Sequence, residues 1–215
     1  MGQIRSAELA PLSNLKDGGV KVIENIKKYG IIYADPPWRY NQKNLSGAAE
    51  HHYSTMSVGE ICKLNIAEVA ADDCVLFLWA TFPQLQEALQ VIKAWGFKYK
   101  TVAFVWLKQN KSGKGWFFGL GFWTRGNAEI CLLATKGKIR RKSARVHQFL
   151  ISPLRGHSQK PDEAREKIVE LMGDLPRLEL FARNKADGWD VWGNEVASDV
   201  QINIYPEKTG GGLCV

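Results

Sequence analysis

The chain has 215 residues, of which 45% are hydrophobic and 24% charged, and its net charge is +7. These values are typical of a globular domain and exclude a disordered chain, a collagen and a coiled coil. No apolar run approaches the roughly 20 residues that a membrane-spanning helix needs, and residues 1–14 lack the apolar stretch of a secretory signal. We therefore expect neither a membrane segment nor export.

Five short apolar runs are predicted as strands. Several are rich in β-branched and aromatic residues, as in strands that are buried on both faces of a sheet. In chain order they are residues 31–34, 73–80, 101–107, 128–135 and 177–183.

Helices are predicted between these strands. Residues 84–95 carry one apolar stripe at helical spacing, followed by a glycine. That stripe consists of Leu85, Ala88, Leu89, Ile92 and Trp95. A second helix is predicted over 161–172, with Pro161 at its first position, and a third over 57–69.

This alternation predicts an α/β fold, with a mostly parallel twisted sheet and helices on both faces. We expect one domain over residues 1–196 and a flexible tail over 197–215. The four cysteines contain no C-x-x-C pair, and the histidines lack a metal-binding spacing. We therefore expect no metal site, a reducing compartment, and burial of Cys74 and Cys131 as small apolar residues.

The tetrapeptide Asp35-Pro36-Pro37-Trp38 directly follows the first predicted strand. Ligands of open α/β sheets bind at the carboxyl ends of strands, so this position suits a site. An ionised carboxylate only accepts hydrogen bonds, and prolines add carbonyl acceptors without N–H donors. With Trp38 as a stacking surface, the motif fits a planar ring with an exocyclic amine, which would donate to Asp35 and to the Pro36 carbonyl. A simple turn is the alternative reading.

Around this motif the chain resembles a known family over residues 29–195. The matching blocks are ADPPWRY, HYSTMS, LFLWAT, WGF, WTRGNAEICLLATKG, HSQKPDE, LELFAR and GWDVWGNE. They are similar to S-adenosylmethionine-dependent adenine-N6 methyltransferases related to the catalytic subunit of the messenger-RNA adenosine methyltransferase, and look most like the short bacterial and phage members. The resemblance implies a Rossmann-like class I methyltransferase fold with a circularly permuted order of motifs.

The resemblance also implies roles for individual residues. Asp35, Pro36, Pro37 and Trp38 would hold and orient the target amine for direct methyl transfer. Asp35 would also contact the cofactor, S-adenosyl-L-methionine, together with Lys160, Phe181, Arg183, Asn194 and Glu195. In this set Lys160 would bind the methionyl carboxylate, although a solvated lysine is the ordinary alternative. The stretch 184–188 departs from the eukaryotic pattern, so no role is carried over to Lys185 or Asp187.

Substrate binding is expected from Tyr40 and Tyr53, beside the target base, and from the basic run KGKIRRKSAR at 136–145. Six basic residues without an acid favour steering of a phosphate backbone over a merely solvated face, so Arg140, Arg141 and Lys142 are assigned to the substrate. The segment 110–150 is predicted as an insert for substrate recognition. Its aromatic residues either stack on bases or pack in the core.

The expected function is transfer of a methyl group to the N6 amine of adenine in nucleic acid, with DNA favoured. An RNA adenine methyltransferase, a non-catalytic nucleic-acid-binding partner and methylation of another planar amine or amide remain as alternatives. We expect a monomer or homodimer in the cytoplasm, associated with the nucleoid, or in the host cytoplasm if the chain is phage-encoded.

Overall fold

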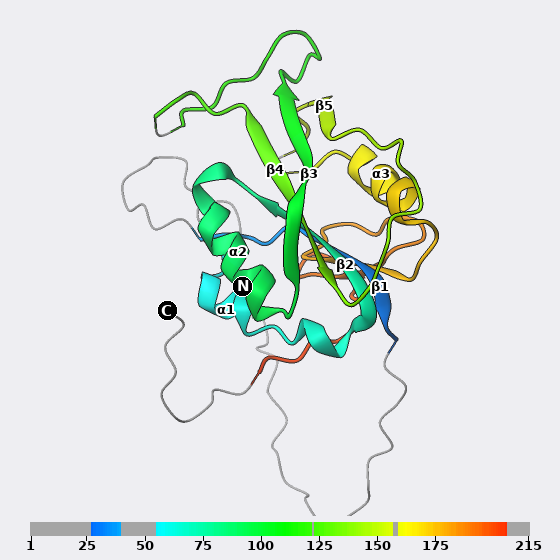
Figure 1. Ribbon diagram of the computed structural model, residues 1–215. Helices are drawn as coiled ribbons and strands as arrows, with labels where there is room; N and C mark the ends of the chain where they lie inside the picture. Colours follow the sequence, from blue (N-terminus) through cyan, green and yellow to red (C-terminus); the bar gives the residue numbers. More distant parts are fainter. Residues whose placement is uncertain (1–26, 40–54, 122, 157–158, 206–215) are drawn as a thin grey trace, which may run out of the picture.

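The computed structural model describes residues 27–39, 55–121, 123–156 and 159–205. Its centre is one twisted sheet in the order β5-β3-β4-β2-β1-β6-β7 (Figure 1). Neighbouring strands are parallel except where β4 pairs with β2 and β3. The strands are β1 (Tyr29–Ala34), β2 (Ala70–Ala80), β3 (Lys98–Gln109), β4 (Ala128–Lys136), β5 (Phe149–Pro153), β6 (Arg177–Leu180) and β7 (Asp190–Trp192).

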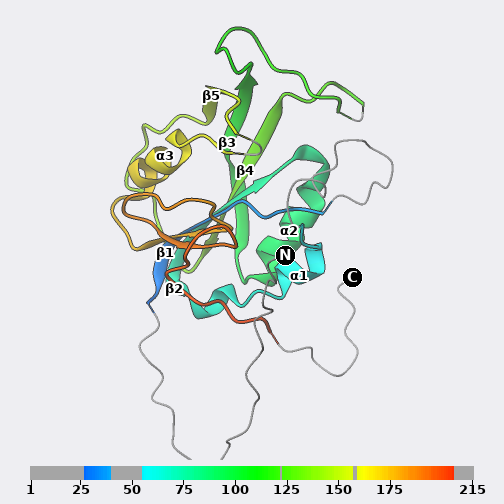
Figure 2. The same cartoon turned by 180° about the vertical axis from the view of Figure 1, so that it is seen from behind.

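Helices cover both faces of this sheet (Figures 1 and 2). Helices α1 (Val58–Cys62) and α2 (Leu85–Ala94) lie on one face and α3 (Glu163–Met172) on the other. Two short 3-10 turns, η2 (Ile66–Glu68) and η3 (Phe82–Gln84), precede β2 and α2. The expected α/β architecture with a mostly parallel sheet and helices on both faces is therefore confirmed.

The continuous apolar run of β2 supplies both hydrophobic cores. Because side chains alternate along a strand, Leu76 and Leu78 pack with α1 and α2, whereas Phe77 and Trp79 pack with α3. All four are at most 1% exposed. Cys131 is buried in the second core, and Cys74 is buried as well, as predicted.

Several predicted elements need correction. The predicted helix over 57–69 is wrong in its middle, because α1 ends at Cys62 and the backbone N–H of Asn65 donates to Asn203 instead of continuing a helix. The proline of α3 lies before the helix, which begins at Glu163 rather than Pro161. In α2, Leu85 and Leu89 are each 37% exposed, so the predicted apolar stripe is displaced toward Val91. The short strands β5 and β7 were not predicted.

The segment after the predicted domain end is not a loose tail where the structure describes it. Val200 and Ile202 pack against the first core, and the backbone N–H of Val191 donates to the Asp199 carboxylate at 3.0 Å. Residues 64 and 204 form a bridge. The expectation of a flexible tail is therefore wrong for residues 197–205, while residues 206–215 lie outside the described part.

The reversed direction of β4 places its two flanking loops at opposite edges of the sheet. The loop 110–127 joins β3 to β4 at the carboxyl edge, where the parallel strands end. The loop 137–148 leaves β4 at the amino edge, since Lys136 pairs with Cys74 near the start of β2. The segment predicted as a recognition insert, 110–150, thus contains a central strand of the sheet between these two loops.

Candidate active site

Asp35 is the first residue after β1, in the middle of the carboxyl edge. β1 is flanked by β2 on one side and by β6 on the other. Asp35 therefore lies where the strands that follow β1 in sequence are divided between the two sides of the sheet. The Asp35-Pro36-Pro37-Trp38 corner is fixed by two backbone bonds, because the N–H of Trp38 donates to Pro36 O at 2.9 Å and the N–H of Met56 to Pro37 O at 2.8 Å. Both proline carbonyls therefore keep one lone pair for a ligand.

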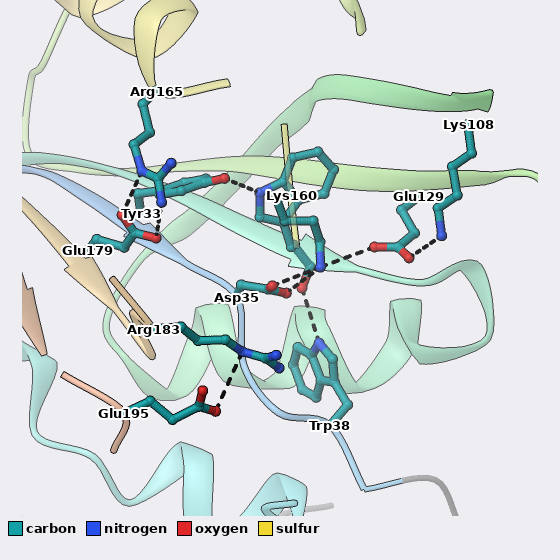
Figure 3. Close-up of polar contacts among 11 residues, drawn as sticks. Tyr33, Asp35, Trp38, Lys108, Glu129, Lys160, Arg165, Glu179, Arg183 and Glu195 are labelled. Carbon is teal, nitrogen blue, oxygen red and sulfur yellow. Dashed lines mark hydrogen bonds and ion pairs between the residues drawn. The ribbon is translucent and has the colours of Figure 1, made fainter. Parts of the chain in front are cut away.

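An alternating row of charges converges on Asp35 (Figure 3). The Lys160 ammonium donates to both Asp35 carboxylate oxygens at 2.8 and 2.7 Å and lies 3.3 Å from Glu129 Oε2. The other Glu129 oxygen accepts from Lys108 Nζ at 2.5 Å. The Lys160 side chain is 8% exposed, the Glu129 side chain 14% and the Asp35 side chain 29%. The Lys160 ammonium is thus shared between two carboxylates.

The protonation of this row follows from burial and from its order. Burial raises the pKa of Asp35, and its ion pair with Lys160 lowers that pKa by less, so the pKa stays above the ordinary value. Burial alone would lower the pKa of Lys160, but Asp35 and Glu129 raise it above its usual range. Burial likewise raises the pKa of Glu129, yet two neighbouring lysines lower it overall. Of the two carboxylates in the row, Asp35 is thus the more easily protonated.

A second buried pair ties α3 to β6 beside Asp35. The Arg165 guanidinium donates to both Glu179 oxygens at 2.7 and 2.8 Å, and it also contacts Asp162 at 2.8 Å. The guanidinium lies 5.9 Å from the centre of the Tyr33 ring. Tyr33 is buried, and its hydroxyl accepts from Trp79 Nε1 at 2.7 Å. This bidentate contact fixes the start of α3 against the ends of β1 and β6.

A cavity of about 860 Å³ opens between α3 and the ends of β1 and β6. Its lining combines cations, carboxylates, an amide and aromatic rings. It includes Asp35, Gln159, Lys160, Arg165, Arg177, Glu179, Phe181, Arg183, Asn184, Lys185, Asp187 and Trp189. The Nε atom of Arg177 is buried and has no hydrogen-bond partner among the described residues. Phe181, which also lines the cavity, has a left-handed backbone conformation with φ 61°. Its ring packs edge-on against the ring of Trp192, with the ring centres 5.4 Å apart.

The structure brings together most of the predicted cofactor residues. Asp35, Lys160, Phe181 and Arg183 line the cavity. Asn194 and Glu195 are not among its lining residues. The Glu195 carboxylate instead lies 3.7 Å from Nε of Arg183, which lines the cavity, so Glu195 forms an ion pair with a lining residue. The side chain of Lys160 faces Asp35 and Glu129, so binding a cofactor carboxylate would require it to give up one of these contacts.

Two expectations about the substrate change. Trp38 is 6% exposed and its indole N–H donates to Trp79 O at 3.1 Å, so the ring supports the corner from the core and does not offer an open stacking face. The basic residues Arg140, Arg141 and Lys142 do not lie beside the base pocket, because the loop that carries them starts at the amino edge. Tyr40 and Tyr53 lie outside the described residues.

Sequence reasoning missed the partners that complete the site. Lys108 and Glu129 lie on the neighbouring strands β3 and β4, and Arg165 and Glu179 lie on α3 and β6. The missed signal was charge within strongly apolar strands, since a Lys or Glu there must be paired to be buried.

The exposed aromatic residues of loop 110–127 include Trp116, which is 46% exposed, and Trp123, which is 101% exposed.

A twisted α/β sheet with a polar cavity at its strand divergence and a carboxylate at its rim defines a ligand-binding protein of the Rossmann-like class. The comparisons identify the family. A family model described as MT-A70 matches residues 29–195, so the chain belongs to the MT-A70 family. This is a methyltransferase family, whose enzymes in general use S-adenosylmethionine. No helix among the described residues is long and apolar enough to span a bilayer.

Individual relatives differ in how much of them the chain covers. The chain is 36% identical over 198 residues to the type II methyltransferase M.MunI of a Mycoplasma species, covering 83% of this chain and 82% of that protein. It is 29% identical to the N(6)-adenosine-methyltransferase catalytic subunit METTL3 of Homo sapiens, covering 79% of this chain and 28% of that protein. An MT-A70-like protein of Arabidopsis thaliana, an N(6)-adenosine-methyltransferase, is also 29% identical, with 25% of its length covered.

Proposed function

We propose that this protein transfers a methyl group from S-adenosyl-L-methionine to the N6 amine of adenine in DNA. The observation that carries the proposal is the position of Asp35, on a rigid corner at the rim of the large polar cavity and in contact with the buried Lys160. The family and the named relatives support adenine methylation.

The cavity lining fits the parts of the cofactor. Arg177, Arg183 and Lys160 supply positive charge for a carboxylate, and the buried Nε of Arg177, which has no hydrogen-bond partner within the described part of the chain, is an available donor. Asp187 and Glu179 supply acceptors for an ammonium or ribose hydroxyls, and Phe181 and Trp189 supply aromatic surface for a purine. When bound, the cofactor supplies a methyl carbon activated by its sulfonium.

Asp35 and the Pro36 carbonyl are suited to hold the amine. The amine of adenine donates two hydrogen bonds, and these two acceptors lie on adjacent residues of a fixed turn. Accepting from both N–H groups increases electron density on the nitrogen and restricts its orientation, so the gain is positioning and fixed electrostatics. Because burial raises the pKa of Asp35, this carboxylate can also hold the proton that the methylated amine releases.

Loop 110–127 is proposed as the part that grips the substrate near the target base. It lies at the same edge as Asp35, and Lys108 and Glu129, on the strands that flank it, belong to the charge row. Its exposed rings, above all Trp116 and Trp123, match the stacking surfaces that hold unpaired bases. A base must leave the duplex to place its amine in a pocket, so such surfaces are needed beside the corner.

DNA is proposed over RNA because the chain covers most of the length of a type II methyltransferase, a class of DNA-modifying enzyme, but about a quarter of the longer adenosine methyltransferases. A DNA-modifying role would place the protein in the cytoplasm with the nucleoid. For its oligomeric state, the proposal is a monomer or a homodimer. RNA as substrate is the second candidate.

The test is transfer of a labelled methyl group to single-stranded and duplex DNA and RNA, followed by analysis of the nucleosides. We expect N6-methyladenine in DNA, and the Asp35→Asn variant, which keeps the shape of the side chain, is the matched control. Label in RNA alone would change the substrate class. Label in neither polymer, with cofactor binding retained, would leave the non-catalytic reading.

A further inference from the structure

A strongly basic surface remains that the active site does not use. Residues 136–145, here called the basic segment, contain six Lys or Arg and no acid. Five of these six side chains are exposed, those of Lys138, Arg140, Arg141, Lys142 and Arg145. Within the described residues, none of the six forms an ion pair with an acidic side chain. Mutual repulsion of so many unpaired cations is a cost to folding, which a polyanionic partner would relieve.

The basic segment runs along the α3 side of the sheet. The backbone N–H groups of Lys142 and Ser143 donate to Leu171 O, in the last turn of α3, at 2.7 and 3.2 Å. Ile139 packs against the core that α3 covers. In Figures 1 and 2 the chain accordingly passes from the lower end of the sheet around α3 to reach β5. Anchored by its backbone and apolar residues, the segment presents its charges outward.

The active site lies at the other end of α3. Lys160 and Asp162 precede the first turn of the helix, and the basic segment contacts its last turn. Ten residues of α-helix span about 15 Å, so these cations cannot reach a base held at Asp35. They can reach phosphates farther along the same molecule, since 15 Å corresponds to about four base pairs of duplex.

We propose that the basic segment binds the backbone of duplex DNA that flanks the target adenine, and thereby holds the substrate without taking part in the chemistry. This inference rests on the proposed function for the identity of the polymer. Cations at the C-terminal end of a helix also stabilise its dipole, but that effect is confined to the last turn and does not require six charges. Duplex DNA carries one charge per about 1.7 Å along its axis, which suits a row of closely spaced cations.

The test compares two double variants that remove equal charge. Arg140→Gln/Arg141→Gln alters the basic segment, and Lys63→Gln/Lys93→Gln alters two exposed lysines at the helices on the opposite face of the sheet. Binding to a fluorescent 30-base-pair duplex of mixed sequence is measured between 50 and 200 mM salt. The slope of log affinity against log salt is negative, and each lost phosphate contact reduces its magnitude by about 0.9. The slope of the first variant should therefore become less steep by nearly two units, and that of the control should stay unchanged.

Methyl transfer to plasmid DNA provides the second readout. We expect the Arg140→Gln/Arg141→Gln variant to raise KM for DNA about tenfold at moderate salt, while kcat stays close to that of the unchanged protein. A slope equal to that of the control, or a loss confined to kcat, would overturn the proposal. Loss of binding to vesicles with anionic lipid, with duplex binding intact, would overturn it in favour of a membrane. If the unchanged protein binds duplex with the expected slope but transfers no methyl, the proposed function fails and the binding surface stands.

Discussion

Replacing Lys160 by Met tests the charge row at the active site most directly. Methionine keeps much of the length of the side chain and removes its charge. The Lys160 side chain is 8% exposed and lies between Asp35 at 2.7 Å and Glu129 at 3.3 Å, so the variant leaves two largely buried carboxylates close together. Removing one partner of a buried ion pair costs about 3–5 kcal/mol. Because Asp35 is 29% exposed and Lys108 still compensates Glu129, we expect the lower end, about 3 kcal/mol.

The sign of the pH dependence follows from Asp35. Its pKa is already raised by burial, and loss of Lys160 raises it further. A carboxyl with a raised pKa in the folded state lowers the free energy of unfolding as the pH rises through that pKa, and the penalty disappears once the group is protonated. The deficit of the Lys160→Met variant relative to the unchanged protein should therefore be largest at about pH 8 and shrink toward about pH 5.

Urea unfolding of the cofactor-free protein at several pH values measures the difference in free energy of unfolding between the Lys160→Met variant and the unchanged protein. The control is Lys167→Met on α3, the helix that follows Lys160. The ion pair of Lys167 with Glu163 at 3.4 Å lies nearer the surface, so this variant should lose less than about 1 kcal/mol at every pH. A deficit for Lys160→Met no larger than that of the control, or one that stays constant with pH, would refute the interpretation of Lys160 as the cation that compensates buried carboxylates.

Three further variants probe other parts of the site. Asp35→Ala should lower methyl transfer by at least about a hundredfold while cofactor binding by calorimetry is largely retained; turnover near normal would remove Asp35 from the chemistry. Arg165→Met should lower the free energy of unfolding by about 3 kcal/mol, because it leaves Glu179, 9% exposed, without its bidentate partner, and an unchanged urea midpoint would contradict this. Trp123→Ala should weaken binding to single-stranded DNA by about 1–3 kcal/mol if its fully exposed ring stacks on a base, and equal affinity in a titration would exclude that contact.

The sequence predicts the framework because apolar runs report burial. β1, β2, β3, β4 and β6 were all expected within a few residues, since each carries a continuous or alternating apolar run. β7 has three residues, and β5 exposes Phe149 and Ile151 at 59% and 50% on the sheet edge, so neither has a pattern that periodicity can detect. The break after α1 depends on a contact with Asn203, which is distant in the sequence.

In the candidate site, too, the sequence predicted some features and not others. Asp35 was found because it follows a strand within a distinctive motif, and Lys160 because it precedes a helix. Their pairing was not predicted, because they are 125 residues apart and only the sheet order brings them together. The basic residues near 140 were misplaced because the sequence shows that 128–135 is a strand but not that it runs opposite to its neighbours.

That reversed strand makes the β3–β4 hairpin loop a replaceable unit. The backbone of Lys108 donates to Asn127 O at 3.0 Å and accepts from Phe117 N at 2.9 Å, which closes the base of the loop within the sheet. A chain entering and leaving at one closed base can change its length and composition without shifting the strands beneath it. Under the proposed function, exchanging loops of different relatives at this base would alter which nucleotide sequence is accepted, while the polar cavity between α3 and the ends of β1 and β6 stays intact.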